Sequence, residues 1–318
     1  PQWSYMNRIM KVAKWVAQTN ENVHYVQLTS FGCGPDAFIV DEIIDMMKRY
    51  GKNVTLLKVD DVNNAGSLRL RIRSLIESLK YKSEEAEPVA HAFQSTPEFL
   101  KKDAGKKILV PFFSDFHSPF VPALFELMGY EFENMPPSDE ASVQYGLKYA
   151  NNEICYPATL VVGDCIRALE SGKYDLNNIV FAITQTGGQC RATNYIALIK
   201  KALLAAGYGN IPVISVSIMD TINEQSGFTP NVKKIIKITM YLLYFSDAMS
   251  KMYYSAVVRE KVPGAARKIL DEYIALGVEA VRQKKSKLMI SYLSEAAKKF
   301  EEITETKDVP RVGIVGEI

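Results

Sequence analysis

The sequence is poor in the residues that build small metal sites and disulfide scaffolds. Its 318 residues include four cysteines and three histidines, and the histidines stand apart at positions 24, 91 and 117. No two cysteines form a Cys-x-x-Cys pair, so a local zinc knuckle has no ligands to be built from. Four cysteines in a chain of this length are also too few for a disulfide scaffold. We therefore expect reduced thiols and a cytoplasmic location.

Strong charge of one sign and long apolar runs are also missing. The 38 basic and 36 acidic residues leave a net charge of +2, so we expect neither nucleic acid nor an anionic membrane as a partner. The longest apolar stretches, residues 107–113 and 238–245, are shorter than the roughly 18 residues of a spanning helix. The first residues show no signal peptide and no initiator Met, which suggests a piece of a longer protein.

The remaining pattern alternates between strands and helices. Apolar runs predict strands at 24–29, 53–59, 107–112, 130–134, 178–184 and 211–217. Periodic segments between them predict helices. This alternation favours an α/β fold with two Rossmann-like parallel-sheet units and a C-terminal helical segment.

We place the boundaries of these parts by composition. Residues 1–106 are expected to form one α/β unit with a charged linker, and 107–225 a second, Rossmann-like unit. A helical segment follows over 226–306, with a proline break at Pro263, and 307–318 has the pattern of the first strand of a truncated further domain. The aromatic and methionine stripe from Met240 to Tyr254 is interpreted as a helix core or as a surface for a partner domain.

Three of the cysteines share one local setting. Cys33, Cys155 and Cys190 each lie in or just before a turn that begins a helix, beside Gly or Pro. In open α/β sheets ligands collect at the carboxyl ends of strands, where such turns converge. The positive end of a helix also stabilises a thiolate. Three thiolates would suit an iron–sulfur cluster with one open position, whereas the alternative is that each cysteine is a small buried hydrophobic residue.

The residues next to these cysteines are weaker candidates for cofactor binding. Glu153 and Arg191 would tune the charge of a cluster, or they are ordinary solvated charges. Gly187 and Gly188 follow a strand, but the sequence has neither Gly-x-Gly-x-x-Gly nor a Lys-Ser/Thr ending there, so a phosphate loop is only weakly indicated. Cys165 falls inside a predicted helix, on another face from Cys155, and is expected to pack in the core.

A further group, Ser114, Asp115 and His117, offers the residue types of a hydrolase triad. Residues this close in sequence rarely form a triad, and no Gly-x-Ser-x-Gly elbow is present. The sequence therefore gives little support to a catalytic serine at this position.

Five segments carry a resemblance to a known family. They are residues 28–36 (LTSFGCGPD), 110–115 (VPFFSD), 152–157 (NEICYP), 186–191 (TGGQCR) and 312–317 (VGIVGE). In this combination the chain resembles the large acyl-CoA dehydratase activases, which are themselves similar to the 2-hydroxyacyl-CoA dehydratases. The resemblance implies α/β/α domains in which three cysteines hold a [4Fe-4S] cluster, or a double-cubane cluster in related proteins. It also implies a separate ATP-hydrolysing activator that passes an electron to the cluster.

The resemblance assigns ligands cysteine by cysteine. Cys155 matches the first family motif, although Tyr156 separates it from Pro157, and Cys190 matches the second. Cys33 resembles the third motif but precedes the other two in the chain. This order suggests that the sequence covers the end of one repeat and most of the next. Whether Cys33 shares a site with Cys155 and Cys190 is left open, and the isolated fragment can lack the cluster.

The expected function is an iron–sulfur-binding, dehydratase-like domain of a larger ATP-coupled protein that transfers low-potential electrons. The expected partners are other domains of the same polypeptide, including the ATP-hydrolysing activator, and an acyl-CoA substrate. The alternatives are a cluster-free scaffold or interaction domain and, less favoured, a stand-alone reductase or dehydratase. The substrate, the cluster type and the oligomeric state, a homodimer included, stay open.

Overall fold

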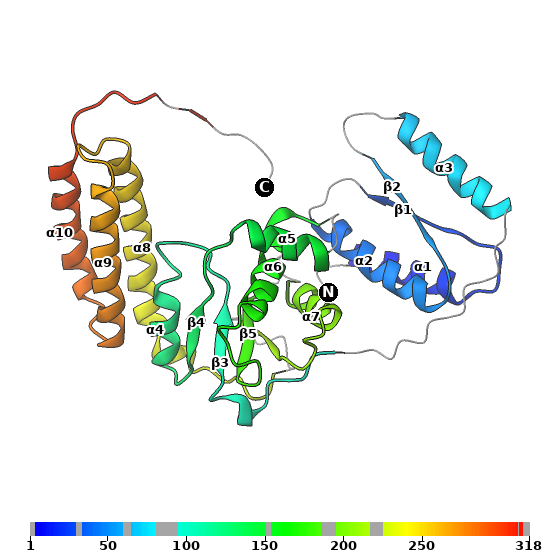
Figure 1. Ribbon diagram of the computed structural model, residues 1–318, viewed down its shortest axis with the longest axis horizontal. Coiled ribbons are helices and arrows are strands. Elements are labelled where there is room, and N and C mark those ends of the chain that lie inside the picture. The colour runs from blue at the N-terminus through cyan, green and yellow to red at the C-terminus, as the bar shows by residue number, and fades with distance from the viewer. Residues whose placement is uncertain are drawn as a thin grey trace. The chain divides into compact units, whose positions relative to one another are not determined.

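The computed structural model describes residues 4–29, 34–59, 65–80, 95–150, 154–185, 195–216, 225–310 and 312–313. It contains two sheets, and the strand pairs described in them are parallel and flanked by helices (Figure 1). This confirms the predicted α/β class with C-terminal helices. The chain divides into two compact units, residues 1–99 with 138–225 and residues 100–137 with 226–318. The boundaries that the sequence suggested stay predictions.

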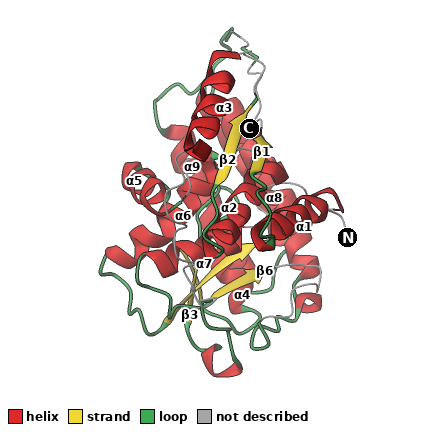
Figure 2. Ribbon diagram, turned by 90° about the vertical axis from the view of Figure 1, so that its right-hand side faces the viewer, coloured by secondary structure: helices red, strands yellow, loops and turns green. Residues whose placement is uncertain are grey.

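The first unit begins with a small parallel sheet. Its elements are α1 (Ser4–Gln18), β1 (Tyr25–Thr29), α2 (Gly34–Arg49), β2 (Val54–Lys58) and α3 (Ala65–Lys80). The two strands lie side by side (Figure 2), in register from Tyr25 opposite Val54 to Thr29 opposite Lys58. Apolar side chains of α1, β1 and α2 form the core. Helix α3 buries none of its residues.

The same unit continues with α5 (Glu140–Tyr149), α6 (Tyr156–Glu170), β5 (Ile179–Thr184), α7 (Tyr195–Ala205) and β6 (Val213–Val216). Strands β5 and β6 are parallel, with Phe181 opposite Val213. Asp139 caps α5, because its carboxylate accepts the backbone N–H of Ser142 at 3.0 Å. Helix α6 is apolar on most of its surface and is buried along its length, so its position is tightly defined.

The second unit combines a strand pair with a helical bundle. Its elements are the 3₁₀ turn η1 (Lys101–Asp103), β3 (Lys107–Val110), α4 (Phe120–Glu126), β4 (Phe132–Asn134), the 3₁₀ turn η3 (Val232–Lys234), α8 (Ile236–Val257), α9 (Ala265–Arg282) and α10 (Leu288–Ile303). Strand β3 pairs with β4 in parallel, Ile108 opposite Phe132. Helices α8, α9 and α10 stand next to one another (Figure 1) around a core that includes Phe120, Phe245 and Tyr273.

The predicted strands are found within two residues of their expected ends, and helices lie between them as expected. The break at Pro263 is confirmed, since α8 ends before it and Gly264 begins the next helix in a left-handed conformation with φ 86°. Of the segment 307–318, predicted to hold the first strand of a further domain, residues 307–310 and 312–313 are described, and they lie outside regular structure. None of the described helices combines the length and apolar character needed to cross a membrane.

Candidate functional site

Cys155 is the residue that starts α6. Its backbone is extended (φ −62°, ψ 145°), and Pro157 follows in the first turn, where proline fits a helix. The Cys155 carbonyl accepts the N–H groups of Ala158 and Thr159 at 3.0 and 3.3 Å. Its side chain makes no capping bond. The backbone of Cys155 thus begins the helix, and its half-buried thiol is left for another contact.

That contact is with the first residue of the next helix in the unit. The Cys155 Sγ lies 3.8 Å from the hydroxyl oxygen of Tyr195, which begins α7. A phenol at this distance is able to donate to a thiolate. The starts of α6 and α7 therefore meet at the cysteine. Cys190 precedes Tyr195 by five positions in the sequence.

Two glycines fix α6 against α5. A Cβ on Gly163 would overlap the backbone carbonyl of Ser142, and a Cβ on Gly146 would overlap that of Thr159. The two helices therefore meet backbone to backbone, which only glycine permits. This contact holds the helix that carries Cys155 at its start.

A polar group lies beside the same helix contact. Asp164 of α6 is buried, accepts a hydrogen bond from Ser138 at 2.7 Å and lies 3.6 Å from the Arg167 guanidinium. Burial raises the pKa of the Asp164 carboxyl, although its hydrogen bonds act in the opposite direction. Arg167 also pairs with the α5 cap, Asp139, at 2.6 Å. These contacts connect α5 and α6, and we interpret them as structural.

Helix α7 is also joined to α2, the helix that follows Cys33 in the sequence. The Lys201 ammonium lies 2.8 Å from Glu42 and 2.7 Å from Asp45. Burial alone would lower the pKa of Lys201, but the bonds to Asp45 and Glu42 outweigh it and raise that pKa. The three helices that follow the three candidate cysteines therefore form a connected group: α2 with α7 through Lys201, and α6 with α7 through Cys155 and Tyr195.

Most of the predicted site falls outside the described residues. This applies to Cys33, Glu153, Gly187, Gly188, Cys190 and Arg191, and their assignments stay predictions. Among the residues that the structure does describe, no three His, Cys, Asp or Glu side chains form a metal-binding group. Cys155 is described, and it lies at a helix start as the sequence predicted.

Cys165 packs in the core as expected. Its side chain is buried on α6, and burial raises the pKa of its thiol far above the ordinary value. A buried, protonated thiol neither binds iron nor reacts readily. Cys165 therefore differs chemically from Cys155 on the same helix.

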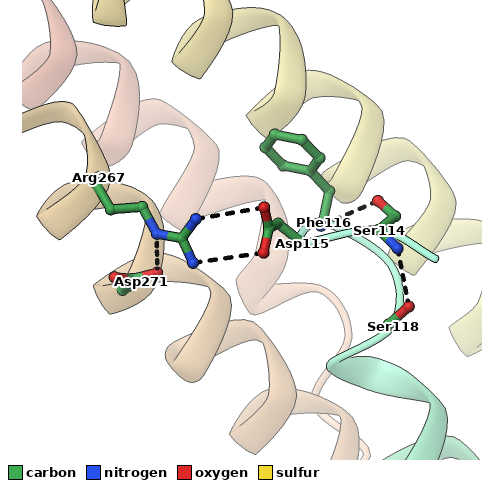
Figure 3. Close-up of polar contacts among 6 residues, drawn as sticks. All are labelled: Ser114, Asp115, Phe116, Ser118, Arg267 and Asp271. Atoms are coloured by element: carbon green, nitrogen blue, oxygen red, sulfur yellow. Dashed lines mark hydrogen bonds and ion pairs between the residues drawn. The ribbon is translucent and has the colours of Figure 1, made fainter. Parts of the chain in front are cut away.

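The loop after β3 holds the Ser114, Asp115 and His117 group, and the structure assigns Asp115 to another role. The Asp115 carboxylate faces the guanidinium of Arg267 on α9, at 3.3 and 3.5 Å, and Arg267 also bonds Asp271 at 2.8 Å (Figure 3). Asp115 thus links the loop to the helical bundle. It does not orient the histidine.

A carboxylate from α8 contacts His117 in its place. The Ser114 hydroxyl lies 3.1 Å from His117 Nδ1, and His117 Nε2 lies 3.3 Å from Asp247. The Ser114 and Ser118 hydroxyls also accept the backbone N–H groups of the loop (Figure 3). Those N–H groups are consequently not directed at a substrate oxyanion, which a serine hydrolase requires. These hydrogen bonds fix the backbone of the loop and add nothing to the weak support that the sequence gives to a catalytic serine.

Comparison with protein-family models, with curated proteins and with solved structures finds no match for this chain.

Proposed function

We propose that this chain is an iron–sulfur-binding, dehydratase-like domain of a larger ATP-coupled protein of the 2-hydroxyacyl-CoA dehydratase type. The observation that carries the proposal is the placement of Cys155. Its thiol lies at the N-terminus of a buried helix, is accessible, and contacts the tyrosine that begins the helix after Cys190. A helix start with a nearby hydroxyl donor favours the thiolate that iron requires.

The proposed ligands are Cys155, Cys190 and Cys33. Each precedes one of the helices α6, α7 and α2, and these helices contact one another through the Tyr195 and Lys201 interactions. A cluster held by three thiolates keeps one iron coordination position open. Glu153 and Arg191 would adjust the charge around the cluster, and Gly187 and Gly188 would let the backbone approach it closely.

In the proposed reaction the bound cluster supplies one-electron chemistry at low potential. Cys155, Cys190 and Cys33 would hold it, and the chemistry it would supply is electron transfer between the ATP-hydrolysing activator and an acyl-CoA substrate or partner. The protein's own part is to orient the cysteines around the cluster. Among the described residues, the Tyr195 hydroxyl and the start of α6 support that part.

The decisive experiment is anaerobic reconstitution of the full chain with ferrous iron and sulfide, followed by iron and sulfide assay and visible absorbance. We expect the wild type to retain iron and sulfide, and Cys155→Ser or Cys190→Ser to lose them. Cys165→Ala is the matched control, because it removes a thiol of the same helix that is buried in the core, and it should retain the cluster.

Two outcomes would overturn the proposal. One is a wild-type chain that stays colourless and iron-free after anaerobic reconstitution, which would favour the cluster-free scaffold. The other is a Cys155→Ser, Cys190→Ser double variant that retains as much iron as the wild type.

A further inference from the structure

One face of α8 carries an apolar stripe that stays largely exposed, although the Tyr254 ring also contacts Phe116 and Tyr253. Positions three or four residues apart share one side of a helix. The stripe consists of Ile236 (60% exposed), Met240 (64%), Tyr244 (62%), Tyr254 (62%) and Val258 at the helix end (49%). The opposite side of α8, with Leu242, Phe245 and Met249, packs in the core. Large apolar residues gathered on one exposed face indicate an interaction surface.

The order of residues along this stripe is symmetrical about position 249. Met240 and Val258 are equally far from that position, and so are Tyr244 and Tyr254. Met240 and Tyr244 therefore have apolar counterparts in the other half, whereas the counterpart of Leu243 is Ser255 and that of Ile236 falls beyond the end of α8.

The charges inside the stripe follow the same symmetry with opposite signs. Asp247 and Lys251 are exposed and stand two positions on either side of Met249. Asp247 contacts His117 at 3.3 Å, while no carboxylate among the described residues pairs with Lys251. A surface of this kind is complementary to itself when it is turned by 180°.

We propose that the α8 stripe binds the same stripe of a second copy of this chain, with the two helices antiparallel across a two-fold axis near Met249. In a two-fold interface, if residue i contacts residue j, then j also contacts i. Tyr244 would meet Tyr254 of the second copy, and Asp247 would meet Lys251 of the second copy, each contact occurring twice.

The charges favour this occupant over others. An anionic surface laid on the stripe would be repelled by Asp247 at its centre, and a basic one by Lys251. A parallel pair of α8 helices would bring Asp247 against Asp247, and like charges in a desolvated contact are costly. Of the two ways to pair α8 helices, the antiparallel one pairs opposite charges while it buries the apolar residues on both sides.

The first test is the mass of the full chain in solution by sedimentation equilibrium. We expect a dimer for the wild type and monomers for Met240→Glu and Tyr244→Glu, with unchanged circular dichroism. Leu70→Glu is the matched control, because Leu70 is equally exposed (67%) on helix α3, and this variant should stay dimeric. A wild-type chain that is monomeric at the highest concentration it tolerates would overturn the proposal.

The second test exchanges the charges. Asp247→Lys and Lys251→Asp should each weaken dimerisation about tenfold or more, because each places like charges together twice. The double exchange should restore the wild-type dissociation constant to within about threefold. His117→Ala, which removes the intrachain contact of Asp247 and the contact with Ser114 but no residue of the stripe, should dimerise normally. A double exchange as weak as the single ones would contradict the paired arrangement.

The third test fixes the direction of the helices by cross-linking. Chains with Tyr244→Cys mixed with chains with Tyr254→Cys should form an interchain disulfide under mild oxidation. Tyr244→Cys alone should not, because the two copies of residue 244 would stand about 15 Å apart along the axis at 1.5 Å per residue. The wild type, with its native cysteines, provides the background. Cross-linking of Tyr244→Cys with itself would indicate a parallel pair and overturn the proposal.

Discussion

Gly163 lies directly against the backbone carbonyl of Ser142, with no room between them for a side chain. Gly146 meets the carbonyl of Thr159 in the same way, so α5 and α6 exchange close contacts in both directions. Backbone atoms on both sides cannot move aside as the end of a flexible side chain can. The position of α6, and of Cys155 at its start, therefore depends on the absence of a methyl group at both positions.

Gly163→Ala should lower the free energy of unfolding by about 2–3 kcal/mol, because the added methyl forces two packed helices apart. The measurement is the urea midpoint by circular dichroism, with the slope checked for two-state behaviour. Gly105→Ala is the control, since no atom lies within 4 Å of a Cβ there. An unchanged midpoint for Gly163→Ala would show that α5 and α6 separate at no cost.

Asp164→Asn should remove an acid-side pH dependence of stability. Burial raises the pKa of Asp164 above 3.8, so the folded state holds the proton more tightly than the unfolded one. The stabilisation from that proton is complete below pH 3.8 and is lost as the pH rises through the folded pKa. Asparagine stays neutral and can still accept from Ser138. Urea midpoints across this range should fall with pH in the wild type more than in the variant.

Asp139→Asn should change the pH dependence of stability in the opposite direction. The backbone N–H of Ser142 and then the Arg167 guanidinium lower the pKa of Asp139 below 3.8, although desolvation opposes them. The stabilisation from its carboxylate is therefore present above pH 3.8 and is lost as the pH falls through the folded pKa. Asparagine preserves the helix cap, so the variant should differ from the wild type at neutral pH and converge with it in acid. A pH dependence that changes in the same direction in both variants would contradict one of the two assignments.

The sequence predicted the elements well because its local signals agreed with the fold. Alternating strand and helix patterns located β1 to β6, and the Cys155 and Pro157 pair marked the start of α6 correctly. Cys165 was assigned to the core from its helical position alone, and the structure places it there. These are features that a local pattern determines.

The contacts between elements could not be predicted from local sequence patterns. Asp115 looked like the partner of His117 because it is near in sequence, whereas the actual partner is Asp247, 130 positions after His117. The one sequence feature that points to a role for Tyr195 is its position at the start of the helix after Cys190. The glycines at 146 and 163 show no turn motif, because their role lies in the packing of one helix on another.

Tyr195→Phe should slow the alkylation of Cys155 at neutral pH in the iron-free chain. A hydroxyl that donates a hydrogen bond to a sulfur favours the reactive thiolate. The Tyr195 hydroxyl lies 3.8 Å from the Cys155 sulfur, and phenylalanine keeps the ring but removes the hydroxyl. Tyr208→Phe is a matched control, since the Tyr208 hydroxyl bonds Glu170 at the opposite end of α6. The rate is followed by mass spectrometry of the Cys155 peptide. Equal rates in the wild type and Tyr195→Phe would show that the hydroxyl does not act on the thiol.

The two cysteines of α6 should differ sharply in reactivity in the iron-free wild type. Cys155 is accessible, whereas Cys165 is buried and burial raises its thiol pKa, so iodoacetamide should modify Cys155 in the folded chain and Cys165 only in denaturant. Urea provides the control, because both thiols should react alike once the chain is unfolded. Modification of Cys165 in the folded state would mean that α6 opens locally.

The same measurement separates the cluster from the scaffold when it is repeated after reconstitution. A thiolate bound to iron is no longer a free nucleophile, so a cluster should protect Cys155 and leave the already inert Cys165 unaffected. Protection should disappear when a chelator removes the iron. A Cys155 that reacts equally fast before and after reconstitution is not an iron ligand, whatever amount of iron the chain retains.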